Sequence, residues 1–343
     1  MTDEGIPEEH AEAAKALRAH GFEVESVLGR GGVGVVFGVT RDGEKLAVKV
    51  AAPWAKVDTT HDPATTVDRV RIPRFADDQR TLRCAPPTEV SVCNRAVEGE
   101  IRRLNEVEDE ALVRVRETLT VNGRAAYVMP RVEGRAFVIA RGKGIRAMAA
   151  ALYRLHEKGF AHGDLKPENI RVADDGRVTF IDPMPVGSEL VTPAWTHLNF
   201  LVSSPLVDSA DPRDRRLVLR HRDFAALALM ATRAYAGEQP WGHDEVLRML
   251  DRSVTMDEKR SELHKARERL NRLLQKLPAT LKGFVGLALD PGLWPEEGPI
   301  FAAYLQARPF ETRCDAMVTM DLPGLFPVEP DVAEGVAAES AGT

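Results

Sequence analysis

Residues 162–169 read HGDLKPEN. Three of these side chains suit chemistry on phosphates: Asp164 as a base that orients a hydroxyl, Lys166 as a cation, and Asn169 as an oxygen ligand for Mg²⁺. An ordinary polar loop before a strand is the alternative interpretation. Features elsewhere in the chain therefore have to decide between the two.

A second stretch, residues 178–182, reads VTFID and ends an apolar run in a lone carboxylate, Asp182. The turn residues DDG at 174–176 lie between the two stretches. A short hairpin turning there would return Asp182 to the neighbourhood of Asn169. The pair would then supply two hard oxygen donors to one metal ion.

A glycine-rich motif follows a predicted strand at residues 24–28: residues 29–36 read GRGGVGVV. Glycines without a Cβ let the backbone turn tightly and let its amides approach phosphate oxygens. Taken alone the motif is weak evidence, because an ordinary hairpin turn has the same composition. Its spacing is set by Gly29, Gly31 and Gly34.

The segments after the glycines predict strands and no helix. Residues 35–39 and 45–50 are apolar runs, and the turn residues RDG at 41–43 separate them. A dinucleotide-binding βαβ unit would place a helix after the glycines. The pattern therefore predicts an antiparallel flap.

Lys49 lies among apolar residues that should face a core. A buried ammonium needs an anionic partner, because burying an isolated charge is costly. We expect Glu100 to be this partner, since residues 100–107 have helical spacing; its neighbour Glu98 is the alternative.

Together these motifs resemble the eukaryotic-type protein kinases, and most closely the serine/threonine branch, over roughly residues 22–310. They stand in that family's order, with the hinge-like residues 127–134 (YVMPRVEG) between Glu100 and Asp164, and Asp223 after Asp182. The resemblance implies an α+β, bilobal fold with an antiparallel N-lobe sheet carrying one helix and a mainly helical C-lobe.

The resemblance also implies an activity, transfer of the γ-phosphoryl group of Mg-ATP to a serine or threonine of a protein substrate, and a role for each matching residue. Lys166, two residues after Asp164, fits the serine/threonine pattern. The implied catalytic residues are Asp164, Lys166, Lys49 and Glu100, and the implied Mg²⁺ ligands are Asn169 and Asp182. The implied ATP-binding residues are Gly29, Gly31, Gly34, Val36, Ala47, Lys49, Met129, Pro130 and Val132.

Several positions depart from the family pattern. Gly163 replaces the arginine that receives an activation-loop phosphate, which argues against that mode of activation. Pro183 and Met184 replace Phe-Gly after Asp182. Because proline restricts the residue before it as well as itself, we predict a segment held mostly in one conformation.

The segment after Asp182 is short. Ser188 is the one hydroxyl before Thr192, which by resemblance would shape the acceptor site. Residues 197–199 read HLN in place of Ala-Pro-Glu, and Trp294 stands where its partner arginine would be. Losing both ends of that ion pair avoids an unpaired buried charge, so we expect a rebuilt C-lobe.

Two other functions share part of this pattern. Small-molecule phosphotransferases of the aminoglycoside or choline kinase type also use His-Gly-Asp followed five residues later by Asn. The glycine motif and Leu165-Lys166-Pro167-Glu168 weigh against them. A pseudokinase scaffold is the other alternative, although every polar catalytic position is filled.

Composition is consistent with one two-lobed unit of 343 residues, 44% hydrophobic. The net charge of −6 does not favour nucleic-acid binding. We expect no membrane association, since no apolar run approaches a bilayer-spanning length and the N-terminus lacks a secretory pattern. Three cysteines without metal-site spacing predict a reduced, cytoplasmic compartment.

The predicted organisation has four parts: an N-terminal extension at 1–21, an N-lobe at 22–132, a C-lobe at 133–326 and a disordered acidic tail at 327–343. We expect a helix at 7–20 that packs on the N-lobe. An Arg- and Pro-rich insertion at 51–90 is either a flexible loop or a site for docking a partner. A charged helix at 257–277 is assigned to the C-lobe, with partner binding as the alternative.

Overall fold

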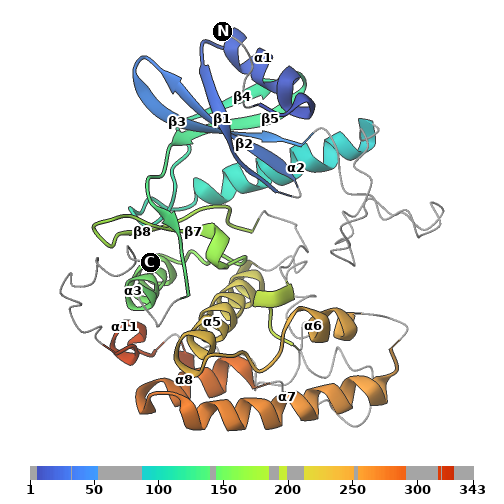
Figure 1. The fold of residues 1–343 in the computed structure, drawn as a ribbon, viewed down its shortest axis with the longest axis vertical. Coiled ribbons are helices and arrows are strands. Elements are labelled where there is room, and N and C mark those ends of the chain that lie inside the picture. Colours follow the sequence, from blue (N-terminus) through green and yellow to red (C-terminus); the bar gives the residue numbers. More distant parts are fainter. Residues whose placement is uncertain are drawn as a thin grey trace, which may run out of the picture.

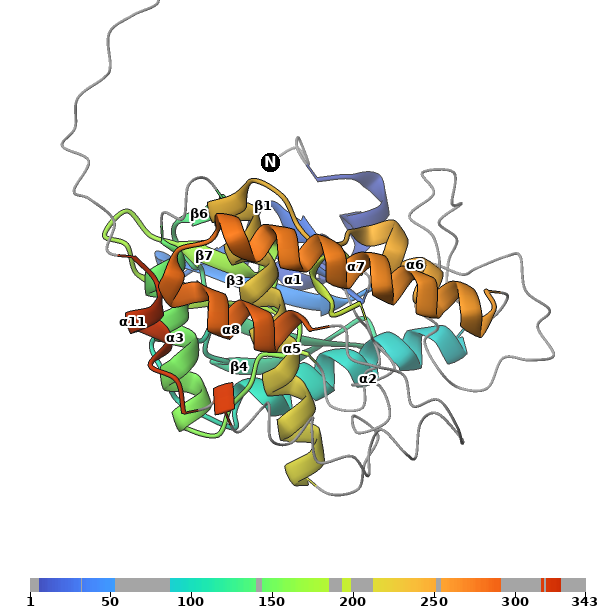
Figure 2. The same ribbon diagram turned by 90° about the horizontal axis from the view of Figure 1, so that it is seen from below.

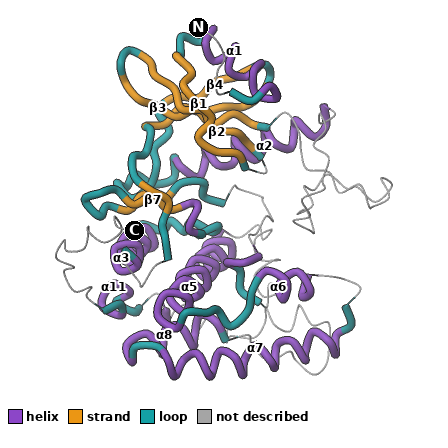
Figure 3. Tube along the Cα trace, in the orientation of Figure 1, coloured by secondary structure: helices purple, strands orange, loops and turns teal. Residues whose placement is uncertain are grey.

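The fold is given by a computed structural model, which describes residues 6–31, 33–52, 87–139, 144–184, 193–198, 212–250, 254–290, 316–317 and 319–327. Within these residues, a five-stranded sheet forms one lobe and most of the helices form the other (Figures 1 and 3). The predicted α+β class is confirmed, and so is the arrangement in an antiparallel-sheet lobe and a mainly helical lobe.

The N-lobe sheet is antiparallel throughout, with strand order β1-β2-β3-β5-β4. Two hairpins turn at Asp42-Gly43 and at Asn122-Gly123, where all four residues have positive φ. That conformation closes a two-residue hairpin without splaying its strands. The predicted antiparallel flap is therefore confirmed. The strands are β1 (Glu23–Arg30), β2 (Gly34–Arg41), β3 (Glu44–Ala51), β4 (Glu117–Val121) and β5 (Arg124–Pro130).

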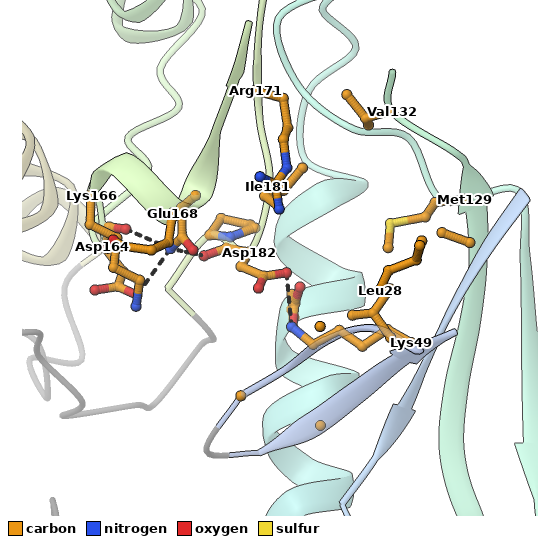
Figure 4. A pocket seen from close by; sticks show the side chains of 18 of the residues that line it. Leu28, Lys49, Met129, Val132, Asp164, Lys166, Glu168, Arg171, Ile181 and Asp182 are labelled. Carbon is orange, nitrogen blue, oxygen red and sulfur yellow. Dashed lines mark hydrogen bonds and ion pairs between the residues drawn. The ribbon is translucent and has the colours of Figure 1, made fainter. Parts of the chain in front are cut away.

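Strand β3 is buried on both faces, which explains how a lysine comes to lie among apolar residues. Successive side chains of a strand point to opposite faces. Val48 and Val50 belong to the core above the sheet, whereas Ala47 belongs to the main core below it. Lys49 shares the face of Ala47 and points toward the cleft between the lobes (Figure 4).

The predicted N-terminal helix is present and covers the upper face of the sheet (Figure 1). It begins as a 3-10 turn, η1 (Glu8–His10), and continues as α1 (Ala11–Ala19). The buried face of α1 consists of Ala13, Ala14 and Leu17, which join the core that includes Phe37 of β2. Small residues on this face let the helix approach the sheet closely.

Helix α2 (Pro87–Leu104) packs on the cleft side of the sheet, against β3 and β5 (Figure 1). Asn94 fastens it to the β4–β5 hairpin. Its Oδ1 accepts a hydrogen bond from the Ala125 amide (2.9 Å), and its Nδ2 donates to the Gly123 carbonyl (3.1 Å). These bonds fix the position of α2 against the sheet that carries Lys49.

Both ends of the predicted insertion at 51–90 turn out to be regular structure. Strand β3 continues to Ala51, and α2 already begins at Pro87. Proline suits the first turn of a helix, so here it marks a helix start where composition indicated a loop. Residues 53–86, and with them the proposed docking role, lie outside the described residues.

A small sheet and a set of helices build the C-lobe. The sheet has strand order β6-β7-β8, and its last two strands form the hairpin expected around residues 174–176. The strands are β6 (Arg135–Ala136), β7 (Ile170–Val172) and β8 (Val178–Phe180). The helices are α3 (Ile145–Glu157), η3 (Pro167–Asn169), η4 (Pro193–Trp195), α5 (Pro212–Ala236), α6 (His243–Leu250), α7 (Met256–Lys276), α8 (Ala279–Leu289) and α11 (Leu322–Leu325).

Helix α5 is the centre of the C-lobe, as expected for the helix that carries Asp223. Residues 221–232 are buried without interruption, which a helix shows when it is enclosed on all sides. Helices α7 and α8 cover it from below (Figure 2). The ionisable side chains of His221, Arg222 and Asp223 therefore lie inside the protein.

Helix α7 matches the helix predicted at 257–277. Leu263, Leu270 and Leu273 are buried, as expected for the inward face, while Leu274 is half-buried. Thr255 begins the helix with a capping box, in which its hydroxyl and the Glu258 side chain each bond the other's backbone amide. The apolar face of α7 packs on α5 and α8.

Residues 328–343 of the predicted tail lie outside the described residues. In the part of the chain that the structure describes, no helix combines the length and the apolar character that a membrane span requires.

Candidate active site

A cleft of about 1010 Å³ lies between the two lobes (Figure 4). Every residue that the sequence analysis placed in the site lines it, from the glycine motif at one end to Asp164 at the other. They come from β1, β2, β3, α2, the end of β5, the loop before β7 and the residue pair after β8. Segments far apart in the sequence thus meet in one cavity.

The Lys49 ammonium bridges two carboxylates. Its Nζ lies 2.6 Å from Glu100 Oε2 and 3.0 Å from Asp182 Oδ1, so the expected ion pair with Glu100 is present. Burial alone would lower the pKa of Lys49, but the charges of Asp182 and Glu100 outweigh it and raise that pKa. Lys49 therefore stays cationic and connects the sheet, α2 and the residue after β8.

Glu100 is almost fully buried, whereas the alternative partner, Glu98, is exposed. Desolvation raises the pKa of Glu100 to about 7, although Lys49 and a hydrogen bond from Tyr127 act in the opposite direction. A group with this pKa changes charge near neutral pH. The brace on Lys49 is therefore sensitive to pH.

Tyr127 is a site residue whose contact the sequence analysis missed. Its hydroxyl donates a 2.6 Å hydrogen bond to Glu100 Oε1, and burial raises the pKa of the phenol well above its usual value, so it remains a donor. The sheet register places Tyr127 directly opposite Lys49. A hydroxyl group within the otherwise apolar run of residues 125–130 is the signal that could have found it.

Asp164, Lys166 and Asn169 form a second polar group across the cleft. Lys166 Nζ lies 2.9 Å from Asp164 Oδ2, and Asn169 Nδ2 donates to the Asp164 carbonyl (2.9 Å) and to Oδ2 (3.2 Å). These bonds fix the Asp164 carboxylate in one orientation. The group has the composition expected at a site of phosphoryl transfer: a carboxylate, a cation and an amide.

Asn169 and Asp182 also suit a divalent cation. The amide nitrogen of Asn169 donates the two hydrogen bonds to Asp164 and a weaker one to the Asp182 carbonyl (3.4 Å). The amide oxygen is left for a ligand. Among the described residues, no group of three or more His, Cys, Asp and Glu side chains could hold a metal by itself. Mg²⁺ commonly takes one or two protein oxygens and completes its shell with water and phosphate. The residues therefore fit that ion.

His162 joins the loop at 162–169 to the residues before Asp182. Its Nε2 lies 2.8 Å from the Ile181 carbonyl, and its Nδ1 lies 3.3 Å from the Asp164 amide. A carbonyl accepts and an amide donates, so Nε2 carries the proton and Nδ1 does not. Burial lowers the pKa of His162, which agrees with this neutral form. The imidazole therefore acts as a structural link.

Asp223 of α5 holds the same loop from below. Its two oxygens accept hydrogen bonds of 2.7 Å from the amides of His162 and Gly163, and Oδ2 lies 2.9 Å from His156 Nε2. The side chain is completely buried. A buried carboxylate satisfied by three donors rigidifies the backbone that it binds.

Two departures from the family pattern prove to be coupled in space. Gly163 has φ +82°, and a Cβ added there would lie 2.6 Å from Leu219 and 2.9 Å from the Cβ of Met184. Met184 and Leu219 form a small core with Ala161. Met184, which stands in the place of the glycine of Phe-Gly, thus fills the space where a longer side chain at residue 163 would lie.

The residues 181–184 are tied to the loop on both sides. The Ile181 amide donates to the Asn169 carbonyl (2.9 Å), and the Met184 amide donates to the His162 carbonyl (2.8 Å). Between them Asp182 has φ +55°, a left-handed conformation that aspartate tolerates better than most residues. That residues 181–184 keep one conformation stays a prediction. The two backbone hydrogen bonds that would hold them in it are present.

In the glycine motif, Gly34 is the residue that packing requires. A Cβ on it would lie 3.1 Å from the Val50 carbonyl and 3.2 Å from Cε of Lys49, so the lysine stem runs directly over it. The Gly31 amide donates to the Gly34 carbonyl (2.8 Å) and closes the turn. A Cβ on Gly29 would meet nothing within 4 Å.

The far end of the cleft is apolar. Val36 and Ala47 of the sheet line it from above, and Met129 and Val132 line it from the hinge side. The Val132 amide makes no hydrogen bond to another described residue and thus remains available to a ligand, in agreement with the ATP-binding role implied for Val132. Pro130 ends β5 beside it.

The stretch that follows residue 192 is anchored in a way that differs from the family pattern. Trp241 Nε1 donates to the Thr196 carbonyl (3.1 Å), and His197 Nε2 lies 3.2 Å from the Asp290 carbonyl. Asp290 in turn pairs with Arg267 (2.7 Å). The rebuilt C-lobe stays a prediction, because Asn199 and Trp294, like Ser188 and Thr192, lie outside the described residues.

Comparison with known proteins does not assign the chain to a family. No protein-family model matches the sequence. A solved structure described as "PpkA-294 apo form" aligns with a TM-score of 0.49 and 16% sequence identity, covering 83% of this chain and 96% of that chain. Identity this low says nothing about activity, so the function is inferred from the side chains in the cleft.

Proposed function

We propose that this protein is a serine/threonine protein kinase that transfers the γ-phosphoryl group of Mg-ATP to a protein hydroxyl. The observation that carries the proposal is the bridge from Lys49 to Glu100 and Asp182, which faces Asp164, Lys166 and Asn169 across one cleft. A purely structural ion pair would not require a second polar group on the opposite wall.

In the proposed reaction, the acceptor hydroxyl oxygen bonds to the γ-phosphorus as the bond from phosphorus to the β–γ bridging oxygen breaks. Asp164 orients the hydroxyl and accepts its proton. Lys49 and Lys166 offset the negative charge on the phosphate oxygens, and electrostatic stabilisation of this kind supplies most of the catalysis in phosphoryl transfer. The products are a phosphorylated side chain and ADP.

Asn169 and Asp182 are the residues that would hold Mg²⁺. The ion supplies charge neutralisation at the phosphates when it is bound. Hydrogen bonds from Asn169 to Asp164 place the metal ligand and the base at a constant separation. The loop therefore presents both functions as one unit.

A small-molecule phosphotransferase remains the second candidate, and Gly163 is the observation that favours it. The glycine is required by the local packing, and that class carries His-Gly-Asp at this position. The acceptor would then be an amino alcohol or a sugar. The base, cations and metal ligands would keep the same roles.

The test is incubation of the full chain with labelled ATP and Mg²⁺, alone, with a library of serine- and threonine-containing peptides, and with a panel of aminoglycosides, choline and sugars. Mass spectrometry locates the phosphate. We expect phosphoserine or phosphothreonine from the wild type. In Asp164→Asn the yield should fall by at least about 100-fold, as is typical for loss of a general base. Lys49→Met should also abolish transfer.

Three outcomes distinguish the candidates. Phosphate on a small molecule with none on peptides would replace the proposal with the second candidate. Tight ATP binding without transfer to any acceptor would indicate a pseudokinase. Equal yields from the wild type and Asp164→Asn would reject the assignment of Asp164.

A further inference from the structure

Arg171 projects into the cleft from the middle of strand β7. Its neighbours Ile170 and Val172 pack on the C-lobe core, and alternation along the strand directs Arg171 to the opposite face. There it lines the cleft, and Figure 4 shows it extending toward Ile181. The sequence analysis did not place this residue in the site.

Two contacts place Arg171 beside the hinge. The sheet register pairs it with Ala136 of β6, the strand that follows the hinge residues. A Cβ added to Gly134, at the end of the hinge, would lie 2.5 Å from the Val172 carbonyl, so the hinge backbone lies directly against β7. Arg171 is thus at the apolar end of the cleft, on the C-lobe side.

The guanidinium has no partner among the residues that the structure describes. Arg171 is half-buried, and it makes no hydrogen bond or ion pair with any other residue that the structure describes. Glu133 and Glu168 line the same cleft, yet neither pairs with it. Placing a charge against apolar walls costs free energy that a bound ligand can offset.

Residues of both lobes line the cleft that Arg171 enters. Val36 and Ala47 line the cleft from the N-lobe sheet, and Arg171 and Ile181 line it from below. A planar guanidinium stacks on aromatic faces, and it does so more strongly where water is excluded. A purine held between these walls would present one face to the sheet and the other to Arg171.

We propose that Arg171 binds the nucleobase, with its guanidinium against the ring face, and so determines how tightly this protein holds purine nucleotides. The proposal rests on the proposed function, because the ligand is the phosphoryl donor. It assigns the phosphates to Lys49 and the metal ligands, and the base to Arg171. The alternative ligand for the guanidinium is a phosphate group.

Calorimetric titration of the full chain with adenosine and, separately, with Mg-ATP distinguishes these two contacts. Arg171→Ala removes the contact, and Arg171→Gln keeps the length and a planar head without the charge. We expect both variants to bind adenosine and Mg-ATP more weakly than the wild type, by the same factor of about 2 to 30 for each ligand. Arg177→Leu is the matched control, because it lies in the same hairpin, is exposed and pairs with Asp175.

A loss confined to Mg-ATP, with adenosine unaffected, would show that Arg171 contacts phosphate and would overturn the proposal. Unchanged affinity for both ligands in Arg171→Ala would overturn it as well. If Arg171→Gln kept the affinity that Arg171→Ala loses, packing alone would account for the contact and the cation would have no role. A wild type that binds neither ligand would reject the proposed function itself, whereas these other results would leave it standing.

Discussion

The hydroxyl of Tyr127 donates a 2.6 Å hydrogen bond to Glu100, on the side of the carboxylate away from Lys49. Glu100 is therefore held between a cation and a neutral donor, both of which come from neighbouring strands of the sheet. Its pKa of about 7 results from burial, which both contacts partly counteract. The state of the site near neutral pH depends on this residue.

Removing the Tyr127 hydroxyl should shift the pH profile of the reaction. The hydrogen bond stabilises the Glu100 carboxylate, so Tyr127→Phe should raise the pKa of Glu100 above 7 and move the acid limb of kcat/KM for ATP to higher pH. A hydrogen bond to a charged group is worth about 1.5–3 kcal/mol, which corresponds to a shift of about 1–2 pH units. Activity at pH 9 should largely recover.

The control for this variant is Tyr153→Phe in α3, which should leave the profile where it is. A uniform loss of activity at every pH in Tyr127→Phe, without a shift of the limb, would show that the hydroxyl has a structural role alone.

Glu100 should also make stability depend on pH. Its folded pKa of about 7 is above the ordinary value of 4.5, so its favourable contribution is complete below pH 4.5 and is lost as the pH rises through 7. Glu100→Gln cannot ionise and should lack this loss. Between pH 4.5 and pH 8, the unfolding free energy of the wild type should fall relative to that of Glu100→Gln by about 3 kcal/mol. Urea denaturation at several pH values measures it, and parallel curves for the two proteins would contradict the assignment.

Gly163→Ala should destabilise the loop that carries Asp164. The new methyl would have to displace Leu219 and Met184, in addition to the cost of a positive φ. Gly159→Ala is the matched control, because Gly159 has φ +80° but no atom within 4 Å of its added Cβ. We expect Gly159→Ala to cost about 1 kcal/mol and Gly163→Ala to cost about 1–3 kcal/mol more. Equal costs would mean that Met184 does not confine this glycine.

Asp182→Asn should abolish phosphoryl transfer by removing the charge that would hold Mg²⁺. The amide keeps the size of the side chain, so the fold should survive, and titration with Mg²⁺ should show a raised half-saturating concentration for any residual activity. Asp175→Asn changes an exposed carboxylate in the β7–β8 turn and should have no effect. Near-normal turnover in Asp182→Asn would show that the metal assignment is wrong.

The fold could be predicted well from the sequence, because its signals are local. The short apolar runs of β2 and β3, turn pairs such as Asp42-Gly43, and the helical spacing of α7 each report on a short stretch of chain. The order of the motifs then placed Lys49, Asp164 and Asp182 around one cleft. The predicted end of the insertion at residue 90 was wrong, since α2 already begins at Pro87. Proline occurs both in loops and at helix starts, so composition did not distinguish the two.

The amino-acid sequence by itself determined the local strands and helices, through periodicity, and the identity of the polar groups in the cleft, through residue type. The two-lobed architecture was implied by the resemblance of the motifs to those of protein kinases. Only the tertiary structure decided that Tyr127 holds Glu100, that Met184 packs over Gly163, and that Arg171 enters the cleft without a partner among the described residues. The physical reason is that each of these relationships joins side chains from separate strands, loops or helices. Their distance and direction depend on sheet register and on packing between layers, which no local pattern specifies.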